Sequence, residues 1–325
     1  MSSRMQSGLV STIIPVFNRP QMVAEAIKSV LSQDYRPVEI IVVNDGSTDH
    51  TDAVLAALSN EHAELTILTQ QNSGPGVARE LGRLHAQGEY IQYLDSDDLL
   101  LPTKFSQQIS ALHSQPECGV AYGKTELSTN GQARNQRAWK RTGEKIDSMF
   151  PAFLRQRWWA TSTPLYRRTL TDRAGPWCST INEEDWEYDC RIAALGTRLA
   201  FVDDFVSIHR RHDQHLSHEG TTDSAKLADR CHARQQIFLS ARRSSVLIPI
   251  ADLQYFAKSV FLLARQCASS GLAAQSEEML ALAIRANGKA TYKHRIFLAL
   301  GKVFGWSTAA RIARLVERLQ TPVAS

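Results

Sequence analysis

The strongest constraint on the fold is the alternation of short apolar runs with helical patterns over residues 9–98. Apolar runs of β-forming residues predict four buried strands, at 9–16, 38–43, 65–68 and 89–94. Helices are predicted between them, over 20–33, after a cap at Thr48 or Asp49, and over 76–87. This alternation is typical of an α/β fold with a mostly parallel central sheet flanked by helices.

Polar residues stand where two of the predicted strands end. Asn44 and Asp45 follow the second strand, and residues 95–98 follow the fourth. In open parallel sheets ligands bind outside the carboxyl ends of the strands, so both groups are candidates for a ligand site. A nicotinamide enzyme is excluded, because the turn VFNRP at 16–20 lacks the glycines that a dinucleotide-binding turn requires.

The segment LDSDD at 94–98 carries the most chemical information. It places three carboxylates within four positions, and these repel one another unless a cation joins them. Mg²⁺ and Mn²⁺ prefer oxygen ligands and often bind through one or two carboxylates together with substrate phosphates. The alternative is a solvated loop that caps the next helix.

Five segments, in order and spacing, give the chain a resemblance to a known family. They are STIIPVFNR, SVLSQDY, VEIIVVNDGSTD, QNSGPGVAREL and GEYIQYLDSDDLLLPTKF. Together they resemble the family 2 glycosyltransferases, over residues 9 to about 220. The resemblance implies the GT-A nucleotide-sugar-binding fold. It also implies an inverting transfer of a sugar from a nucleotide-diphosphate donor to an acceptor.

The resemblance also implies a donor site. Asp45 is expected to hydrogen-bond the base, commonly uracil, and Pro15 and Phe17 to line the base and ribose site. The whole expected nucleotide-sugar site is Pro15, Phe17, Asn18, Asp45, Gly74, Arg79, Asp95, Ser96 and Asp97. Glu80 departs from the family's usual asparagine, which weakens the donor contacts expected there, and Arg79 could instead be a surface helix residue.

A divalent ion, Mn²⁺ or Mg²⁺, is the expected cofactor. Asp95 and Asp97 match the DxD pair of the family, Asp98 is an alternative metal ligand, and His212 is expected to contact the donor phosphate or the metal. The run HRRHDQHLSH at 209–218 could also suggest zinc. A dedicated zinc site is disfavoured because no cysteine or carboxylate completes it at the usual spacing.

The acceptor hydroxyl needs a general base, and the run EEDWEYDCRIAALG at 183–196 offers one. The resemblance assigns Asp185 as the base, with Glu184 as the next candidate. In the alternative reading these acids only favour the N-terminus of a helix, which Gly196 closes.

Two basic segments are candidates for contact with the acceptor. Residues 134–173 hold ten Arg or Lys against three acids, with Trp139, Trp158, Trp159 and Tyr166 among them. Residues 285–318 hold eight Arg or Lys and one Glu, interleaved with apolar residues. We expect a glycan or lipid-linked acceptor of polysaccharide or cell-envelope biosynthesis, and peripheral membrane contact through 285–318. Either segment could also be a solvated basic face.

Composition sets the remaining expectations. The net charge of +4 does not indicate nucleic acid, and five dispersed cysteines without a CxxC pair disfavour a disulfide framework. Without a signal-peptide pattern or an apolar run of about 18 residues, a cytoplasmic protein is expected, and it could also contact the inner face of the membrane.

We expect a glycosyltransferase domain at 1–220 and an all-helical region at 221–325. Rival functions are a sugar nucleotidyltransferase and a non-catalytic nucleotide-sugar-binding relative.

Overall fold

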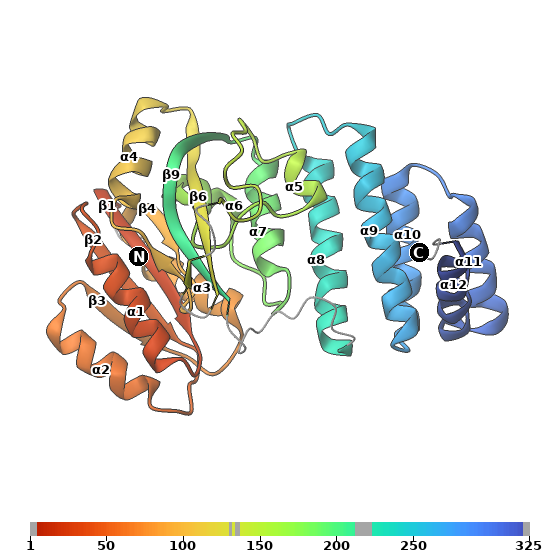
Figure 1. The fold of residues 1–325 in the computed structure, drawn as a ribbon, viewed down its shortest axis with the longest axis horizontal. Coiled ribbons are helices and arrows are strands. Elements are labelled where there is room, and N and C mark those ends of the chain that lie inside the picture. The colour runs from red at the N-terminus through yellow and green to blue at the C-terminus, as the bar shows by residue number, and fades with distance from the viewer. Residues whose placement is uncertain (1–4, 130–131, 134–136, 212–222, 321–325) are drawn as a thin grey trace.

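The computed structural model describes residues 5–129, 132–133, 137–211 and 223–320 (Figure 1). The predicted alternation of strands and helices in the first hundred residues is confirmed. Its elements are β1 (Gln6–Val16), α1 (Pro20–Leu31), β2 (Val38–Asn44), α2 (Thr51–Glu61), β3 (Leu65–Thr69), α3 (Pro75–His85) and β4 (Gly88–Tyr93).

The second half of the sheet domain has strands that the sequence did not predict, whereas its helix at 183–196 was predicted. Its elements are β5 (Leu99–Leu100), α4 (Lys104–Ser114), β6 (Cys118–Thr129), β7 (Gln132–Ala133), α5 (Ala152–Arg155), β8 (Leu165–Arg167), α6 (Arg168–Ala174), α7 (Glu184–Ala194) and β9 (Arg198–Arg211). The strand order is β3-β2-β1-β4-β8-β6-β9-β5, with β7 paired to β6. The sheet is mixed, since β1–β4 run parallel while β8 is antiparallel to both of its neighbours.

Parallel pairing aligns the ends of the strands at one edge of the sheet. Val16 of β1 pairs with Asn44 of β2, and Asn44 pairs with Thr69 of β3. On the other side of β1, Ile13 pairs with Tyr93 near the end of β4. The residues that follow these strands are therefore neighbours in space, although they are far apart in the sequence.

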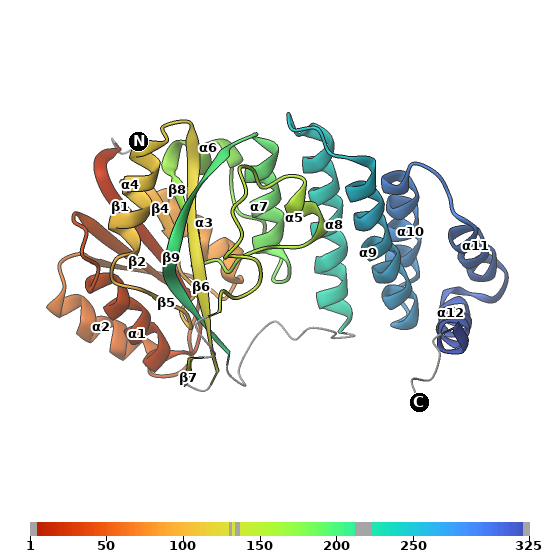
Figure 2. The ribbon, with the colours of Figure 1, turned by 45° about the horizontal axis from the view of Figure 1, so that its top comes forward.

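The two faces of the sheet carry separate apolar layers, because successive strand residues point to opposite faces. Ile14 and Val42 pack in a cluster with α1, α2 and α4, whereas Ile13 and Val43 face a second cluster that includes α3, α6 and α7. The two layers of helices around the sheet are visible in Figure 2.

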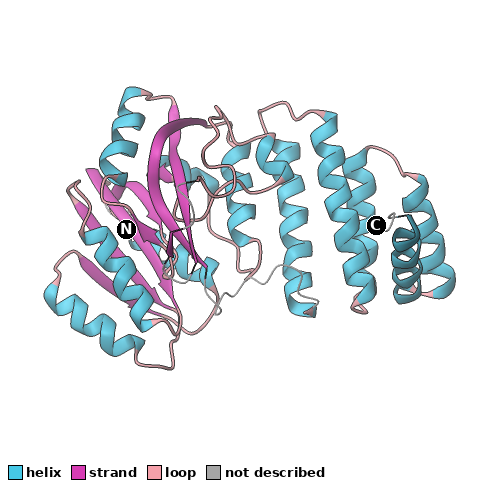
Figure 3. Cartoon of the chain, in the orientation of Figure 1, coloured by secondary structure: helices cyan, strands magenta, loops and turns pink. Residues whose placement is uncertain are grey.

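The predicted helical region follows as a row of helices beside the sheet domain (Figure 3). It comprises α8 (Ser224–Arg243), α9 (Ile250–Ser269), α10 (Ala273–Asn287), α11 (Tyr292–Phe304) and α12 (Trp306–Gln320). The α9–α10 hairpin turns at Gly271, which has a positive φ of 78°. The proposed boundary near residue 220 lies outside the described residues.

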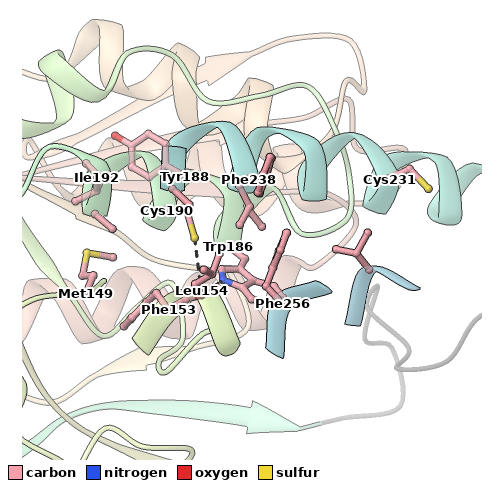
Figure 4. Close-up of a cluster of buried hydrophobic side chains, with 14 of the residues drawn as sticks. Met149, Phe153, Leu154, Trp186, Tyr188, Cys190, Ile192, Cys231, Phe238 and Phe256 are labelled. Carbon is pink, nitrogen blue, oxygen red and sulfur yellow. Dashed lines mark hydrogen bonds between the residues drawn. The ribbon is translucent and has the colours of Figure 1, made fainter. Parts of the chain in front are cut away.

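One apolar core joins the sheet domain to these helices. Phe153 of α5, Trp186 of α7 and Phe256 of α9 belong to one buried cluster (Figure 4). The indole Nε1–H of Trp186 donates to the carbonyl oxygen of Phe153 at 2.6 Å, which satisfies the polar atom of this buried ring. The first helices of the row are therefore packed against the helix that carries the predicted acid pair.

The aromatic residues of the basic segment 134–173 mostly belong to the core. Trp159 is fully buried, and Trp158 and Tyr166 are only 3% and 2% exposed, so their faces are not available to an acceptor. Trp139 is the member of the predicted set that remains partly exposed. In the part of the chain that the structure describes, no helix combines the length and apolar character needed to cross a membrane.

Candidate active site

A cavity of about 930 Å³ opens at the carboxyl edge of β1, β2 and β4. Its size lies in the range of small-molecule sites. The predicted residues in its lining are Pro15, Phe17, Asp45, Gly74, Arg79, Asp95, Ser96, Asp97, Glu184 and Asp185. The fold thus gathers most of the predicted donor residues and the acid pair of α7 around one space. Asn18 and Asp98 do not line it, and His212 lies outside the described residues.

Asp45 holds the loop that follows β3. Its Oδ1 accepts hydrogen bonds from Gln70 Nε2 at 2.7 Å and from the Ser73 backbone N–H at 2.8 Å. Its Oδ2 accepts from the Gly74 backbone N–H at 2.9 Å. A carboxylate offers about four acceptor sites, so a ligand can still reach one of them. The expected hydrogen bond from Asp45 to the nucleotide base therefore stays a prediction. In the structure, Asp45 holds the loop after β3.

Asn18 connects two loops behind the cavity. It has a positive φ of 51°, its backbone N–H donates to Ser47 Oγ, and its side-chain oxygen accepts from the Thr48 N–H at 2.7 Å. Asparagine tolerates this left-handed conformation better than most residues. These contacts fix the loops after β1 and β2 relative to each other, beside Phe17 in the cavity wall.

Arg79 is the central cation of the site. It is 3% exposed, which rules out the alternative that it is a surface helix residue. Its Nη2 lies 2.7 Å from Asp95 Oδ1, and its Nη1 lies 2.9 Å from Glu184 Oε1. The guanidinium also lies over the ring of Trp177, 4.7 Å from the centroid. One buried arginine therefore joins the carboxylate at the end of β4 to the acid at the start of α7.

Close packing around Gly76 makes this arrangement possible. A Cβ atom at Gly76 would lie 2.1 Å from the carbonyl oxygen of Cys178, which is part of the backbone. Glycine therefore lets the first turn of α3 approach the segment that leads to α7. This approach brings Arg79, one turn further along α3, within reach of Glu184.

The three aspartates of 95–98 have different surroundings. Asp95 pairs with Arg79, and Asp97 pairs with Arg19 at 2.8 Å. Burial raises the pKa of Asp95 despite its ion pair with Arg79, and the charges of Asp98 and Asp97 add to the shift. Both Asp95 and Asp97 line the cavity.

Asp98 faces the protein interior and is fully buried. Its carboxylate accepts from Ser162 Oγ at 2.8 Å and from the Arg210 N–H at 3.1 Å, and it lies 3.0 Å from His209 Nδ1. Burial alone would lower the pKa of His209, but the Asp98 charge outweighs it and raises the pKa. In this structure Asp98 serves to connect β9 to the loop after β4.

The donor atoms at the cavity fit a hard divalent ion. Over residues 5–129, 132–133, 137–211 and 223–320, no three or more His, Cys, Asp or Glu side chains form a metal-binding group. Asp95 and Asp97 nevertheless provide carboxylate oxygens in the cavity wall. Since Mg²⁺ typically takes only one or two protein carboxylates and completes its shell with phosphate and water, this pair suffices for a shared site.

The acid pair of α7, Glu184 and Asp185, consists of two carboxyl groups whose pKa values are shifted in opposite directions. Burial and the charge of Asp185 raise the pKa of Glu184 to about 7, although the ion pair with Arg79 opposes the shift. Burial would also raise the pKa of Asp185, but Arg157, with Arg79 and Lys140, lowers it below the ordinary value. Environments that separate two neighbouring pKa values in this way are typical of acid–base sites.

Arg157 sets the position of Asp185. Its Nη1 lies 2.5 Å from Asp185 Oδ2, and its Nε lies 2.6 Å from Asp189 Oδ2, one turn further along α7. Asp185 remains 29% exposed at its side chain and lines the cavity, so a hydroxyl group can reach it. No motif in the sequence distinguishes Arg157 from the other cations of the basic segment 134–173, which holds ten.

Further residues line the cavity wall. Trp139, one of the aromatic residues noted in the basic segment, stacks on His209, with ring centroids 4.2 Å apart. Lys140, Arg19 and Asn182 also line the wall and were not among the expected site residues. Arg19 stands inside the segment STIIPVFNR, which was a signal that could have identified it. Asn182 lies directly before the acid cluster of 183–185 and had no such signal.

Comparison with known proteins identifies the family. Residues 11–171 match the model of glycosyl transferase family 2. These residues form a domain of glycosyltransferase family 2. It is 40% identical over 113 residues to an uncharacterized glycosyltransferase of Rickettsia typhi, and this alignment covers 35% of each chain. The similarity thus spans about a third of the length of the first curated relatives that it matches.

Two further comparisons give one curated relative and one solved structure. Glycosyltransferase GlyG of Streptococcus pneumoniae is 36% identical over 128 residues, which cover 38% of this chain and 42% of GlyG. The crystal structure of S. aureus TarS 1–349 in complex with UDP-GlcNAc superposes with a TM-score of 0.73 at 16% identity, covering 95% of this chain and 91% of that TarS fragment. That match includes the helical region as well as the family 2 domain, and at this identity it establishes the fold alone.

A second solved structure resembles the chain less closely. It is the mannosyltransferase PcManGT of Pyrobaculum calidifontis in complex with GDP-Man and Mn²⁺, with a TM-score of 0.52 at 19% identity. The match covers 95% of this chain and 86% of PcManGT. The GT-A fold expected from the sequence is thereby confirmed for this chain.

Proposed function

We propose that this protein is an inverting glycosyltransferase. It would move a sugar from a nucleotide-diphosphate donor, UDP-linked, to a hydroxyl group of a glycan or lipid-linked acceptor. The observation that carries the proposal is the arrangement around Arg79, which holds Asp95 at 2.7 Å and Glu184 at 2.9 Å. Asp95 of the expected donor site and the expected acid pair of α7 therefore line one cavity. A direct transfer requires this, because the donor and the acceptor must be held next to each other when they react.

The expected donor lies along the carboxyl edge of the sheet. Pro15, Phe17 and the loop held by Asp45 provide a wall for the nucleoside. The diphosphate would then lie beside Asp95 and Asp97. When bound there, Mn²⁺ or Mg²⁺ would act as a Lewis acid that neutralises the charge of the departing diphosphate. The choice of UDP is supported by the UDP and UDP-GlcNAc present in structures of TarS.

Asp185 is the proposed general base. Its lowered pKa keeps it ionised near neutral pH, its side chain is partly exposed, and Arg157 fixes its orientation. It would take the proton of the acceptor hydroxyl as the oxygen attacks the anomeric carbon and the nucleoside diphosphate leaves from the opposite face. Glu184 is the alternative base, because a pKa of about 7 suits proton transfer at neutral pH.

The test combines donor binding with turnover. The protein is first screened for thermal stabilisation by nucleoside diphosphates and nucleotide sugars with and without Mn²⁺, since a ligand of the folded state raises its apparent stability. Release of nucleoside diphosphate is then measured with glycan and lipid-linked acceptors, for wild type and Asp185→Asn. Asp203→Asn is the matched control, because Asp203 is 76% exposed at its side chain and pairs with Lys124 away from the cavity.

The possible results separate the rival functions. A glycosyltransferase binds a nucleotide sugar and releases nucleoside diphosphate in an Asp185-dependent manner. A non-catalytic relative binds the donor without release by any acceptor. Formation of a nucleotide sugar from a sugar phosphate and a nucleoside triphosphate would identify a nucleotidyltransferase instead. A protein that no nucleoside diphosphate or nucleotide sugar stabilises would contradict the proposal.

A further inference from the structure

The outer face of α11 is apolar and exposed. Tyr292 is 68% exposed, Ile296 55% and Val303 70%. Their spacing of four and seven residues places them on one side of the helix, because side chains three or four positions apart lie on the same face. We call these three residues the α11 stripe. Its apolar side chains are not needed for the core, since α11 packs through its other side.

The buried residues of α11 show which side of this helix packs against the rest of the protein. His294 and Phe297 are buried, and Phe297 contacts the rings of Phe261 and Trp306. A Cβ atom at Gly301 would lie 2.6 Å from the Trp306 ring, so α11 and α12 are in close contact there. The α11 stripe lies on the opposite side of this helix. The helix itself lies at the end of the molecule away from the sheet (Figure 2).

Cations border the α11 stripe. Lys293, Arg295 and Lys302 are all exposed, and Lys289 precedes the helix. Between Glu278 and Glu317 the sequence contains seven Lys or Arg and no acidic residue. An amphipathic helix that combines an apolar face with Lys and Arg at its borders is suited to the headgroup region of an anionic membrane.

We propose that the α11 stripe and its cationic border bind an anionic lipid surface. The apolar side chains would enter the boundary between headgroups and acyl chains, while Lys293, Arg295 and Lys302 contact lipid phosphates. A second copy of the chain is a poorer occupant, because a twofold contact brings the same cationic border against itself. This inference is independent of the transfer reaction, since α11 contributes no residue to the cavity wall.

The test is co-sedimentation of the full chain with vesicles. Phosphatidylcholine vesicles are compared with vesicles that also contain phosphatidylglycerol, at low and at high salt. The wild type should sediment with the anionic vesicles and should be released as salt screens exposed charges. For the double variant Ile296→Glu/Val303→Glu we expect a loss of about tenfold in apparent lipid affinity, since two anions replace two apolar contacts.

Leu84→Glu is the matched control, because Leu84 is 62% exposed on α3, in the sheet domain. It should leave vesicle binding unchanged. Circular dichroism and thermal unfolding establish that both variants are folded, and thermal stabilisation by UDP establishes that the cavity is intact. Wild-type protein that stays in the supernatant at low salt overturns the proposal. Equal binding by the double variant, or a change of its oligomeric mass in light scattering, would assign the stripe to another role.

Discussion

Arg234 of α8 forms a two-point ion pair with Glu183, the residue that immediately precedes the acid pair of α7. Arg234 Nε lies 2.8 Å from Glu183 Oε2, and its Nη2 donates to Oε1 at 3.0 Å. Glu183 has a positive φ of 61°, a conformation that most residues avoid and that the surrounding contacts must maintain. The helical region therefore takes part in placing the residues that begin α7.

Glu183→Gln should lower turnover more than it weakens donor binding. The substitution removes the charge that Arg234 holds, so the backbone before Glu184 and Asp185 becomes less restricted and the proposed base is less well placed. We expect a fall of about tenfold in kcat with a smaller change in KM. Steady-state kinetics with the donor measure both.

Glu144→Gln is the control for Glu183. Glu144 also pairs with an arginine, Arg141, but both side chains are at least 40% exposed. Exposed ion pairs contribute little, so this variant should behave as wild type. Unchanged kcat in Glu183→Gln would show that the contact with α8 has no role in placing α7.

The pH dependence of turnover distinguishes the two candidate bases. The pKa of Asp185 is lowered, so it is ionised throughout the range from pH 5 to 8. A rate limited by this base stays level as the pH falls through 7. Glu184 has a pKa of about 7, so a rate limited by it falls by about tenfold for each pH unit below 7. We expect the level profile, with activity lost in Asp185→Asn.

Retained transfer by Asp185→Asn, together with loss in Glu184→Gln, would reverse this assignment. The matched substitutions keep the shape of each side chain and remove only the basic oxygen. Thermal stabilisation by the donor should be preserved in Asp185→Asn, because the substitution acts on the chemical step rather than on the nucleoside contacts.

The divalent ion should strengthen nucleotide binding through Asp97. Without an ion, the carboxylates of 95–98 repel the phosphates, so UDP should bind weakly. Calorimetric titration of wild type and Asp97→Ala with and without Mn²⁺ tests this. Mn²⁺ should increase the affinity of wild type by about tenfold or more and that of the variant by much less. Equal affinity in all four titrations contradicts the metal role.

Arg79→Met should destabilise the fold as well as abolish activity. It leaves Asp95 and Glu184 without their shared cation, and removing one partner from a buried ion pair typically costs about 3–5 kcal/mol. Arg141→Met, at an exposed ion pair, should cost less than about 1 kcal/mol. Urea unfolding of both variants measures the difference in the free energy of unfolding. Equal stability of the two would show that Arg79 does not hold the site together.

Removal of the Arg79 charge should also change how the stability of the protein depends on pH. Because the pKa of Glu184 is raised to about 7 in the folded state, the folded protein binds its proton more tightly than the unfolded chain. The associated stability is present below the ordinary carboxyl pKa and is lost as the pH rises through 7. Removal of the Arg79 charge should raise this pKa further. The stability of Arg79→Met should therefore fall more steeply above pH 7 than that of wild type.

The sequence by itself determined that the candidate site residues after the strands lie at one edge of the sheet. Alternating apolar strands and amphipathic helices require a parallel sheet, and such a sheet aligns its strand ends at one edge. Asp45 and Asp95 could therefore be assigned to a common edge, although fifty residues separate them. The helical nature of 225–320 also followed from local patterns, because helix periodicity depends on near neighbours.

Only the tertiary structure decided how these residues are partnered. The pattern LDSDD could not distinguish Asp97, in the cavity wall, from Asp98, which is buried against His209. The contact of Arg79 with Glu184 joins positions 105 residues apart. The burial of Trp159 depends likewise on packing against other elements. Partner choice depends on distance in space, and no local pattern of residues encodes that distance.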